Sequence, residues 1–458
     1  MFDKIKTKLA SSKFDLQKEN ENTMTSAINE WLSMYKGQAT WVSQADGVFS
    51  CGIEQTLTRA IRNKILSEAV IEVEGEGEKA DAIRDAFDRL KKNINTELEL
   101  ALAVGGFILK PYMDGERIGV EFVLQGEFIP YGFDDDGNLI DVGFVSQIKK
   151  ANEVYTKIER HFIDDDIYTI TSRAFNERGE VPLTSVSEWA DITPVVRLMT
   201  SVCLFGYYRV PLANTIDINS PLGISIYEPS KTLIQLADKQ LSRLDWEYNG
   251  GQMAVDVDEL AVSTSNLKFN KLDECQQRLY RGIDLTDDKL YEVFAPSLRD
   301  ANYRTGLNEY YKAIEDKTGV SRGTLSDVQE QPKTATEVVS SKQREYITIS
   351  ENQNQLEECL YSLFDAMIVY ANMQGLIGDC SLMIDWGDSV LVDKSAELQE
   401  KIQLMQNGIL TEAEVRAFYL GIEVEEAEEQ LGQDTLEGLL GGLDDGQGTG
   451  EDNQPNTV

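Results

Sequence analysis

The sequence predicts an α+β fold that is mainly helical, and three observations support this prediction. Apolar residues recur with the 3.6-residue period of a helix through the first 100 residues and again from residue 229 onward. Between Phe107 and about Arg173 the period changes to two, which is typical of strands. Neither Pro nor Gly occurs from Thr334 to Met373, which predicts a helix roughly 60 Å long at about 1.5 Å per residue.

The N-terminal part of the chain combines helices with β-hairpins. Helical spacing covers "NTMTSAINEWLSMYKG", "GIEQTLTRAIRNKILSEAV" and "EKADAIRDAFDRLKKNINTELELALAVGG". The period-two region contains Asp114-Gly115 and Asp136-Gly137 between alternating flanks, which is a strong signal for hairpin turns. The run "FDDDGNLIDVGFV" looks at first like a calcium loop, but it lacks the acid spacing and terminal Glu of an EF-hand. We therefore interpret it as a turn.

Two helices enclose a small strand-containing segment in the middle of the chain. The first is expected in "SKTLIQLADKQLSRLDWEYNGG", where Gly250-Gly251 end it. Its apolar stripe consists of Leu233, Ala237, Leu241, Leu244 and Tyr248. A strand is expected in "QMAVDVDELAV", within a mixed segment of residues 252–296. The second helix is expected in "LRDANYRTGLNEYYKAIEDKT" and stops at Gly319.

A capping box marks the start of the long helix, because Thr334 and Glu337 can exchange hydrogen bonds between side chain and backbone N–H. The first half of this helix is polar on all sides. The second half carries apolar residues at core spacing, namely Leu356, Leu360, Leu363, Phe364 and Met367. A strand-like piece and two short helices follow, with a second capping box from Thr411 to Glu414. The Gly-rich, acidic segment 441–458 is expected to be disordered.

The charge of the chain is unusual, with 79 acidic and 43 basic residues and a net charge of −36. Two interpretations remain open: a solvated acidic surface, or a surface that must not adhere to nucleic acid. The start of the chain lacks the apolar core of a secretion signal, and no window reaches about 18 consecutive apolar residues. We expect a soluble protein made in the cytosol, with no membrane partner.

The residue types exclude most catalytic designs, so we predict that the protein is not an enzyme and has no cofactor and no metal site. His161 is the only histidine, and a structural role is expected for it. There is no phosphate-binding loop of the GxxxxGK[ST] type. The cysteines are odd in number and form no CxxC pair, being Cys51, Cys203, Cys275, Cys359 and Cys380. Because 79 carboxylates could still supply a two-metal site, a metal-dependent nuclease remains a remote alternative.

The order of these parts resembles the portal proteins of tailed bacteriophages, in the branch common in phages and prophages of Gram-positive bacteria. The resemblance rests on "ALAVGGFILKPYMDGERIGVEFV", "YRVPLANTIDINSPLGISIY", "LADKQLSRLDWEYNGGQMAVDVDE", "FAPSLRD" and "GTLSDVQEQPKTATEVVSSKQREY". Together these stretches cover roughly residues 100 to 350 in family order, and their combination is specific although each alone is weak.

The resemblance implies the portal fold, in which wing, stem, clip and crown regions assemble into a ring around a central channel. The implied regions are a wing at 1–228 with hairpins at 107–173, a stem helix at 229–250, a clip at 251–297, a second stem helix at 298–319, a tunnel loop at 320–333, a long helix at 334–373, a wing return at 374–394, crown helices at 395–440 and an acidic tail at 441–458.

The resemblance also implies the function of a head–tail connector at one vertex of the capsid. Such a ring, usually of twelve subunits, nucleates procapsid assembly and lets double-stranded DNA pass during packaging and ejection. Its implied partners are other copies of itself, the terminase large subunit, the major capsid and scaffolding proteins, a head-completion or adaptor protein, and DNA without sequence specificity. The implied location is the virion, after assembly in the host cytoplasm.

By resemblance, "SRGTLSDVQEQPKTA" corresponds to the family's tunnel loop, which projects into the channel. Its residues are Ser326, Asp327, Val328, Gln329, Glu330, Gln331 and Lys333. Candidate contacts with DNA phosphates are Lys333, Lys342 and Arg344, for which an ordinary solvated helix face is the alternative. Thr334 and Glu337 would cap the helix after the loop. Another ring-forming head–tail protein, such as an adaptor or minor capsid protein, is the alternative to a portal, and a ring of thirteen is the alternative to twelve.

Overall fold

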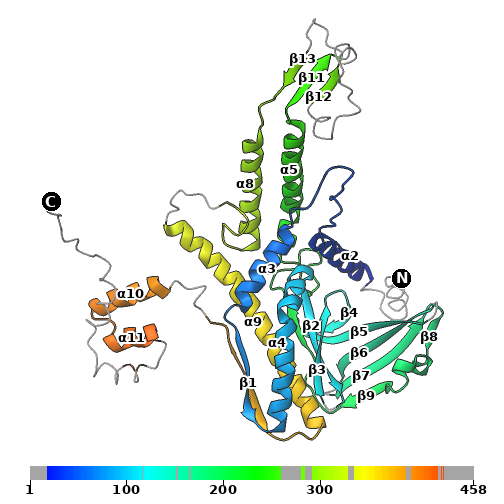
Figure 1. The fold of residues 1–458 in the computed structure, drawn as a ribbon. Coiled ribbons are helices and arrows are strands. Elements are labelled where there is room, and N and C mark those ends of the chain that lie inside the picture. Colours follow the sequence, from blue (N-terminus) through cyan, green and yellow to red (C-terminus); the bar gives the residue numbers. More distant parts are fainter. Residues whose placement is uncertain are drawn as a thin grey trace, which may run out of the picture. The chain divides into compact units, whose positions relative to one another are not determined.

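The computed structural model describes residues 18–115, 117–150, 153–164, 167–258, 280–283, 291–327, 335–387 and 394–420, together with Val424 and Ala427. The chain divides into two units, Met1–Trp386 and Gly387–Val458. Both helices and strands are present, so the α+β prediction is confirmed (Figure 1). None of the helices within the described ranges has the length and apolar character needed to span a lipid bilayer.

Four helices form the core of the first unit: α2 (Lys18–Tyr35), α3 (Ile53–Leu66), α4 (Glu78–Val104) and α9 (Ala335–Met373). The helical periodicity of the first 100 residues therefore identified α2, α3 and α4 correctly. The apolar stripe of α4 packs against the second half of α9, and the rings of Phe87 and Phe364 meet edge to face with centroids 6.3 Å apart. Burial of these facing stripes stabilises the contact between segments that are far apart in the sequence.

One strand of the first unit was not predicted. β1 (Val70–Glu76) lies between α3 and α4 and pairs antiparallel with β14 (Asp379–Asp385). Its residues alternate, with Ile71 and Val73 buried and the intervening glutamates exposed. The expectation that residues 1–100 are mostly helical missed this strand, because its partner lies about 300 residues away and the alternation spans only a few residues.

The period-two region forms antiparallel hairpins, as the sequence predicts, and with three later strands these hairpins make up two sheets. The smaller has the order β10-β2-β3, from Gly206–Arg209, Gly106–Asp114 and Arg117–Leu124, and it contacts α4 and α9. The larger has the order β4-β5-β6-β7-β8, from Phe128–Phe133, Leu139–Lys150, Glu153–Asp164, Ile167–Asn176 and Gly179–Val181, with β9 (Val195–Leu198) beside β7. The strands thus extend beyond Arg173, where we expected them to end.

Both predicted Asp-Gly turns are found between paired strands. Gly115 and Gly137 adopt positive φ values of 63° and 82°, which favour glycine. The Asp134 carboxylate accepts the backbone N–H groups of Asp136 and Asn138 at 3.0 and 2.7 Å. Its oxygens are therefore engaged in the turn between β4 and β5, in agreement with the turn interpretation.

His161 lies in β6 and has a structural environment. Its side chain is 1 % exposed, and its two ring nitrogens lie 2.8 Å from the Tyr168 hydroxyl and 2.9 Å from Glu159 Oε1. The ring also packs edge to face against Phe144. Burial lowers the pKa of His161, which favours the neutral ring.

Two helices lie side by side in the middle of the chain, α5 (Lys231–Gly250) and α8 (Asp300–Thr318), with short strands between them in sequence (Figure 1). These strands form a sheet of order β12-β11-β13, from Tyr280–Ile283, Ala254–Asp258 and Tyr291–Phe294. The two predicted helices and the strand after Gly251 are thus confirmed. The predicted stripe of α5 is wrong at Tyr248, which is exposed, because the buried face there includes the polar residue Glu247 instead.

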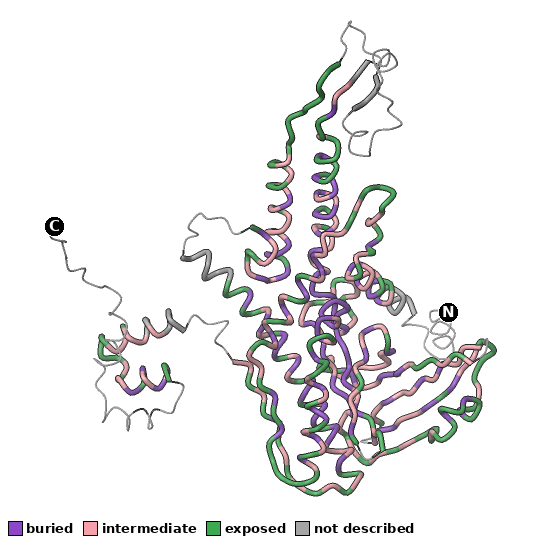
Figure 2. The backbone as a smooth tube through the Cα atoms, in the orientation of Figure 1, coloured by how far each residue is buried: buried purple, intermediate pink, exposed green. Residues whose placement is uncertain are grey.

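The long helix α9 runs from Ala335 to Met373, which confirms a helix of about forty residues. The described side chains of its first half are mostly exposed, whereas the five apolar residues predicted for its second half are all buried (Figure 2). The burial difference agrees with the polar and apolar halves of the sequence.

The second unit contains α10 (Lys394–Gln406) and α11 (Glu412–Leu420). The second predicted capping box is present: the Thr411 N–H donates to Glu414 Oε2 at 2.6 Å, and the Glu414 N–H donates to Thr411 Oγ1 at 3.3 Å. The ammonium group of Lys401 lies 4.4 Å from the ring centroid of Phe418, so the two helices contact each other. The acidic tail at 441–458 lies outside the described residues.

Candidate functional site

The α5–α8 pair is held together by polar contacts at its strand-bearing end and nearer its middle. Toward the strands, Glu247 of α5 is buried and accepts from the guanidinium of Arg299 at 2.8 Å and from the Arg299 backbone N–H at 3.0 Å. Nearer the middle, the Gln240 amide donates to the Tyr303 carbonyl oxygen at 3.2 Å. These contacts give the two helices a fixed side-by-side arrangement.

The start of α5 is fastened to the N-terminal part of the chain through Asp238. This carboxylate is 1 % exposed and accepts the Trp41 indole N–H at 2.8 Å and the Cys51 backbone N–H at 2.7 Å. Ser242, one turn further on, accepts the Phe49 backbone N–H at 3.2 Å. The segment between α2 and α3 is therefore attached to one face of α5.

The end of α8 is set by Gly319, as the sequence predicts. Gly319 has φ 77° and its backbone N–H donates to the Glu315 carbonyl oxygen at 3.0 Å. A β-carbon at this position would also collide with the side chain of Thr348 on α9. The position therefore requires glycine both for its left-handed backbone and for the close approach of α9.

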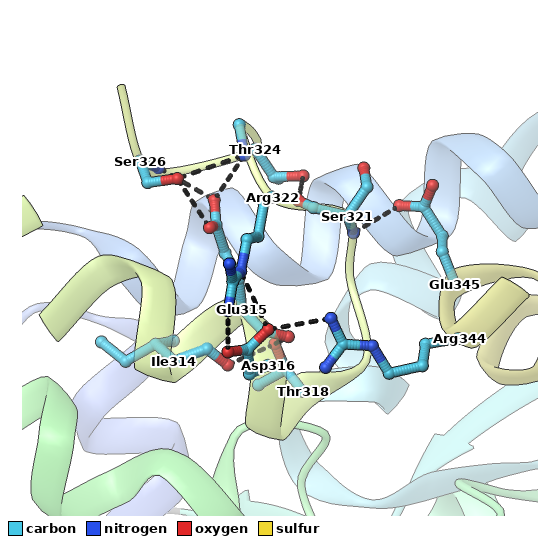
Figure 3. A network of polar contacts seen from close by, with 11 residues as sticks. Ile314, Glu315, Asp316, Thr318, Ser321, Arg322, Thr324, Ser326, Arg344 and Glu345 are labelled. Carbon is cyan, nitrogen blue, oxygen red and sulfur yellow. Dashed lines mark hydrogen bonds and ion pairs between the residues drawn. The ribbon is translucent and has the colours of Figure 1, made fainter. Parts of the chain in front are cut away.

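The residues after Gly319 fold back along α8 instead of leaving it (Figure 3). Glu315, in the last turn of α8, has a fully buried carboxylate. Its Oε1 accepts the backbone N–H groups of Gly323, Leu325 and Ser326 at 3.1, 2.6 and 2.8 Å, and its Oε2 accepts the Ser326 hydroxyl at 2.7 Å. We call this set of contacts the Glu315 clamp.

A second acidic residue links the returning segment to the long helix. Asp316 accepts from the guanidinium of Arg322 at 2.8 Å and from that of Arg344 on α9 at 2.9 Å (Figure 3). The hydrogen bond with Arg322, joined by that with Arg344, lowers the pKa of Asp316, against the opposing effect of burial. The neighbouring Glu345 accepts the Ser321 backbone N–H at 3.0 Å and pairs with Lys64 of α3.

The structure places two of the predicted tunnel-loop residues. Ser326 is buried and belongs to the Glu315 clamp, and the Asp327 backbone N–H donates to the side chain of Asn308 on α8 at 2.9 Å. Asn308 lies about two helical turns before Glu315, so the segment runs toward the strand-bearing end of α8. The remaining predicted residues, Val328, Gln329, Glu330, Gln331 and Lys333, lie outside the described residues.

The predicted phosphate contacts and helix cap are only partly described. Lys342 has an exposed side chain on α9, and Arg344 is paired with Asp316 within the same chain. Lys333 and Thr334 lie outside the described residues, and Glu337 lies in α9 without a described side chain. The structure thus brings Arg344 and Ser326 into one polar network through the neighbours Glu315 and Asp316.

Sequence reasoning missed the residues that organise this network. Glu315, Asp316 and Glu345 lie in helices, where an acidic residue ordinarily indicates a solvated face. One signal was present in the sequence: Glu315 directly follows the apolar residue Ile314 and lies one turn after Tyr311.

Comparison with known families assigns the chain to a class of protein. A family model described as "Phage portal protein, SPP1 Gp6-like" matches residues 72–434, which is most of the chain. The chain therefore belongs to the phage portal proteins, within the SPP1 Gp6-like family. A search among curated proteins found no match.

The match confirms the prediction of a tailed-phage portal protein and favours it over the adaptor and nuclease alternatives. The family consists of structural virion components that serve DNA packaging and connect head to tail, and its members in general form homo-oligomeric rings that associate with capsid and terminase. The matched residues include the α5–α8 pair, the Glu315 clamp and all of α9.

Proposed function

We propose that twelve copies of this chain close into a ring whose central channel carries double-stranded DNA into and out of the phage head. In this ring α5 and α8 form the stem, β11 to β13 belong to the clip, and α9 leads from the channel to the wing. The helices α10 and α11 form the crown. The observation that carries this proposal is the anchored return along α8 of residues 320–327, which are the first part of the predicted tunnel loop.

The surface at the strand-bearing end of the stem supports an assembled state. Large apolar side chains are exposed there in the single chain, with Trp246 at 69 %, Tyr291 at 65 % and Val293 at 52 %. Large apolar side chains that gather on a protein surface mark interaction sites, and we propose such a role for these three. We assign this end to contacts with neighbouring subunits and with the terminase large subunit.

The charge of the chain supports easy passage of DNA. Each phosphate–cation contact adds affinity through counterion release, so a cationic channel would retard a moving duplex. A subunit with a net charge of −36, repeated around a ring, instead repels the phosphate backbone. Lys333, Lys342 and Arg344 are the proposed exceptions, and Arg344 would contact a phosphate in addition to its pairing with Asp316.

The remaining partners follow from the position of such a ring. We propose that it assembles in the host cytoplasm with the major capsid and scaffolding proteins, nucleates the procapsid, and later binds a head-completion or adaptor protein. The ring itself performs no chemical step in this scheme, since the energy for DNA movement comes from the terminase.

Electron cryomicroscopy of the assembled ring tests this proposal. We expect twelvefold symmetry, or thirteenfold for rings assembled without a capsid, and a channel whose narrowest point is formed by residues 328–333. An object without a central channel would refute the ring, and a constriction formed by another segment would refute the loop assignment.

Deletion of Asp327–Gln331 tests the loop in the virus. The deletion spares Ser326 and the Glu315 clamp, so rings should form as in the wild type, whereas DNA packaging or retention should be impaired. The measurement is the ratio of filled to empty heads after introduction of the deletion into the phage genome. Unchanged yields of filled heads would contradict a role for the loop in the channel.

A further inference from the structure

The first part of the predicted tunnel loop, residues 320–327, is attached to helices along its whole described length. Ser321 is bound to Glu345 of α9, Arg322 to Asp316 of α8, and Asp327 to Asn308 of α8. Between these points the Glu315 clamp holds residues 323–326. Residues 320–327 therefore form an extension of the α8 surface, and the remaining residues of the predicted loop lie outside the described part of the chain.

The Glu315 carboxylate holds this segment through an unusual concentration of donors. Three backbone N–H groups converge on one oxygen, and a hydroxyl binds the other, without a Lys or Arg partner among the described residues (Figure 3). The convergence requires a sharp local turn, which Gly323 provides with φ 100°. A buried carboxylate without such donors would be strongly unfavourable, so the acid and the fold of the segment depend on each other.

We propose that Glu315 is a positioning residue for DNA translocation: it fixes the base of the tunnel loop to α8, so that a force of DNA on the loop tip reaches the stem helix. This inference rests on the proposed function. The bridge from Arg322 through Asp316 to Arg344 gives the same segment a second connection, to α9. Because the segment cannot bend independently of these helices, displacement of the tip and displacement of α8 are coupled.

The test uses three variants of the full chain, each assembled into rings and each introduced into the phage. Glu315→Ala removes the acceptor. Glu315→Gln keeps an oxygen for the three N–H groups and offers an amide N–H to the Ser326 oxygen, so it should restore anchoring. Ser326→Ala removes one of the four bonds. Glu309→Ala is the control, since Glu309 is an exposed acid on the same helix that pairs with Lys312.

Two measurements separate anchoring from simple stability. Hydrogen exchange of the amides of Gly323, Leu325 and Ser326 in assembled rings should accelerate roughly ten- to a hundredfold in Glu315→Ala, since bonds to a charged acceptor are lost, and less in Ser326→Ala. Rings of both variants should form normally, while the fraction of filled heads falls. Glu315→Gln and Glu309→Ala should resemble the wild type in both measurements.

The outcomes distinguish this inference from the proposed function. If Glu315→Ala accelerates exchange but heads fill normally, while deletion of Asp327–Gln331 prevents filling, the anchor is irrelevant and the inference fails alone. If the deletion also leaves filling unchanged, the proposed function of the loop fails. If Glu315→Gln forms rings but packages as poorly as Glu315→Ala, charge and not anchoring matters. If Glu315→Ala forms no rings, the test rests on Ser326→Ala. Accelerated exchange in Ser326→Ala together with normal filling of heads would then overturn the inference.

Discussion

Glu54 allows a quantitative test of the packing beside the base of α5. Its side chain, in the first turn of α3, is 1 % exposed, and neither carboxylate oxygen accepts a hydrogen bond from another residue in the described part of the chain. Burial raises the pKa of Glu54 from an ordinary 4.5 to about 7, its own backbone N–H opposes the shift, and the charge of Asp238 adds to it. We predict that Glu54→Gln stabilises the protein at neutral and alkaline pH.

The sign and size of the effect follow from proton linkage. The folded state binds the Glu54 proton more tightly than the unfolded state does. The contribution of this proton to folding stability is therefore fully present below pH 4.5 and disappears as the pH rises through about 7. The rise in pKa from 4.5 to about 7 corresponds to roughly 3 kcal/mol, at about 1.4 kcal/mol per pKa unit. Glu54→Gln should therefore gain up to roughly 3 kcal/mol per subunit above pH 7, and almost nothing near pH 4.5.

The assay is denaturant and thermal unfolding of both proteins in the same oligomeric state, across the range from about pH 5 to 8. The difference between variant and wild type isolates Glu54 from the other titrating groups. Glu74→Gln serves as the control, because Glu74 is exposed in β1. The free energy of unfolding of this variant should not show the pH-dependent gain expected for Glu54→Gln. A Glu54→Gln difference that is the same at both ends of the range would refute a buried carboxyl with a raised pKa.

Two further substitutions test the contact of β10 with α9 and the contact of α5 with the start of α8. Gly206→Ala should lower the free energy of unfolding in denaturant by about 1–3 kcal/mol, because the added β-carbon would collide with the Cys359 carbonyl oxygen and force β10 away from α9. Unchanged stability would mean that the two elements separate easily. Arg299→Ala should accelerate hydrogen exchange at the start of α8 while rings still form, since it removes the guanidinium bonds to Glu247. Exchange like that of the wild type would show that packing alone holds this end.

Most of the helices and hairpins could be predicted because their signals are local. The Asp-Gly turns, the glycine that ends α8 and the 39 residues of α9 without Pro or Gly each determine structure within a few residues of themselves. β1 escaped prediction because its pairing with β14 is a property of two distant segments. Its four exposed positions between Ile71 and Glu76 include three glutamates, which are uncommon in strands.

The end of α8 at Gly319 could be predicted from the sequence, but the contacts that follow it could not. That these residues form a tunnel loop stays a prediction from the resemblance. The sequence could not show that Ser326 faces Glu315, because a serine in a polar loop and a glutamate in a helix are both ordinarily solvated. Their contact depends on the return of the chain along α8, which is set by several weak interactions at once.

The buried acids also change the interpretation of the negative charge. Asp238 and Glu315 accept hydrogen bonds from backbone, indole and hydroxyl groups, and neither forms an ion pair within the described part of the chain. Such donors stabilise a carboxylate without cancelling its charge, unlike the pairing of Glu345 with Lys64. The chain can therefore join distant segments through acids and still keep a large negative charge. This supports a ring in which the same carboxylates contribute to the fold of each subunit and to the field that repels DNA.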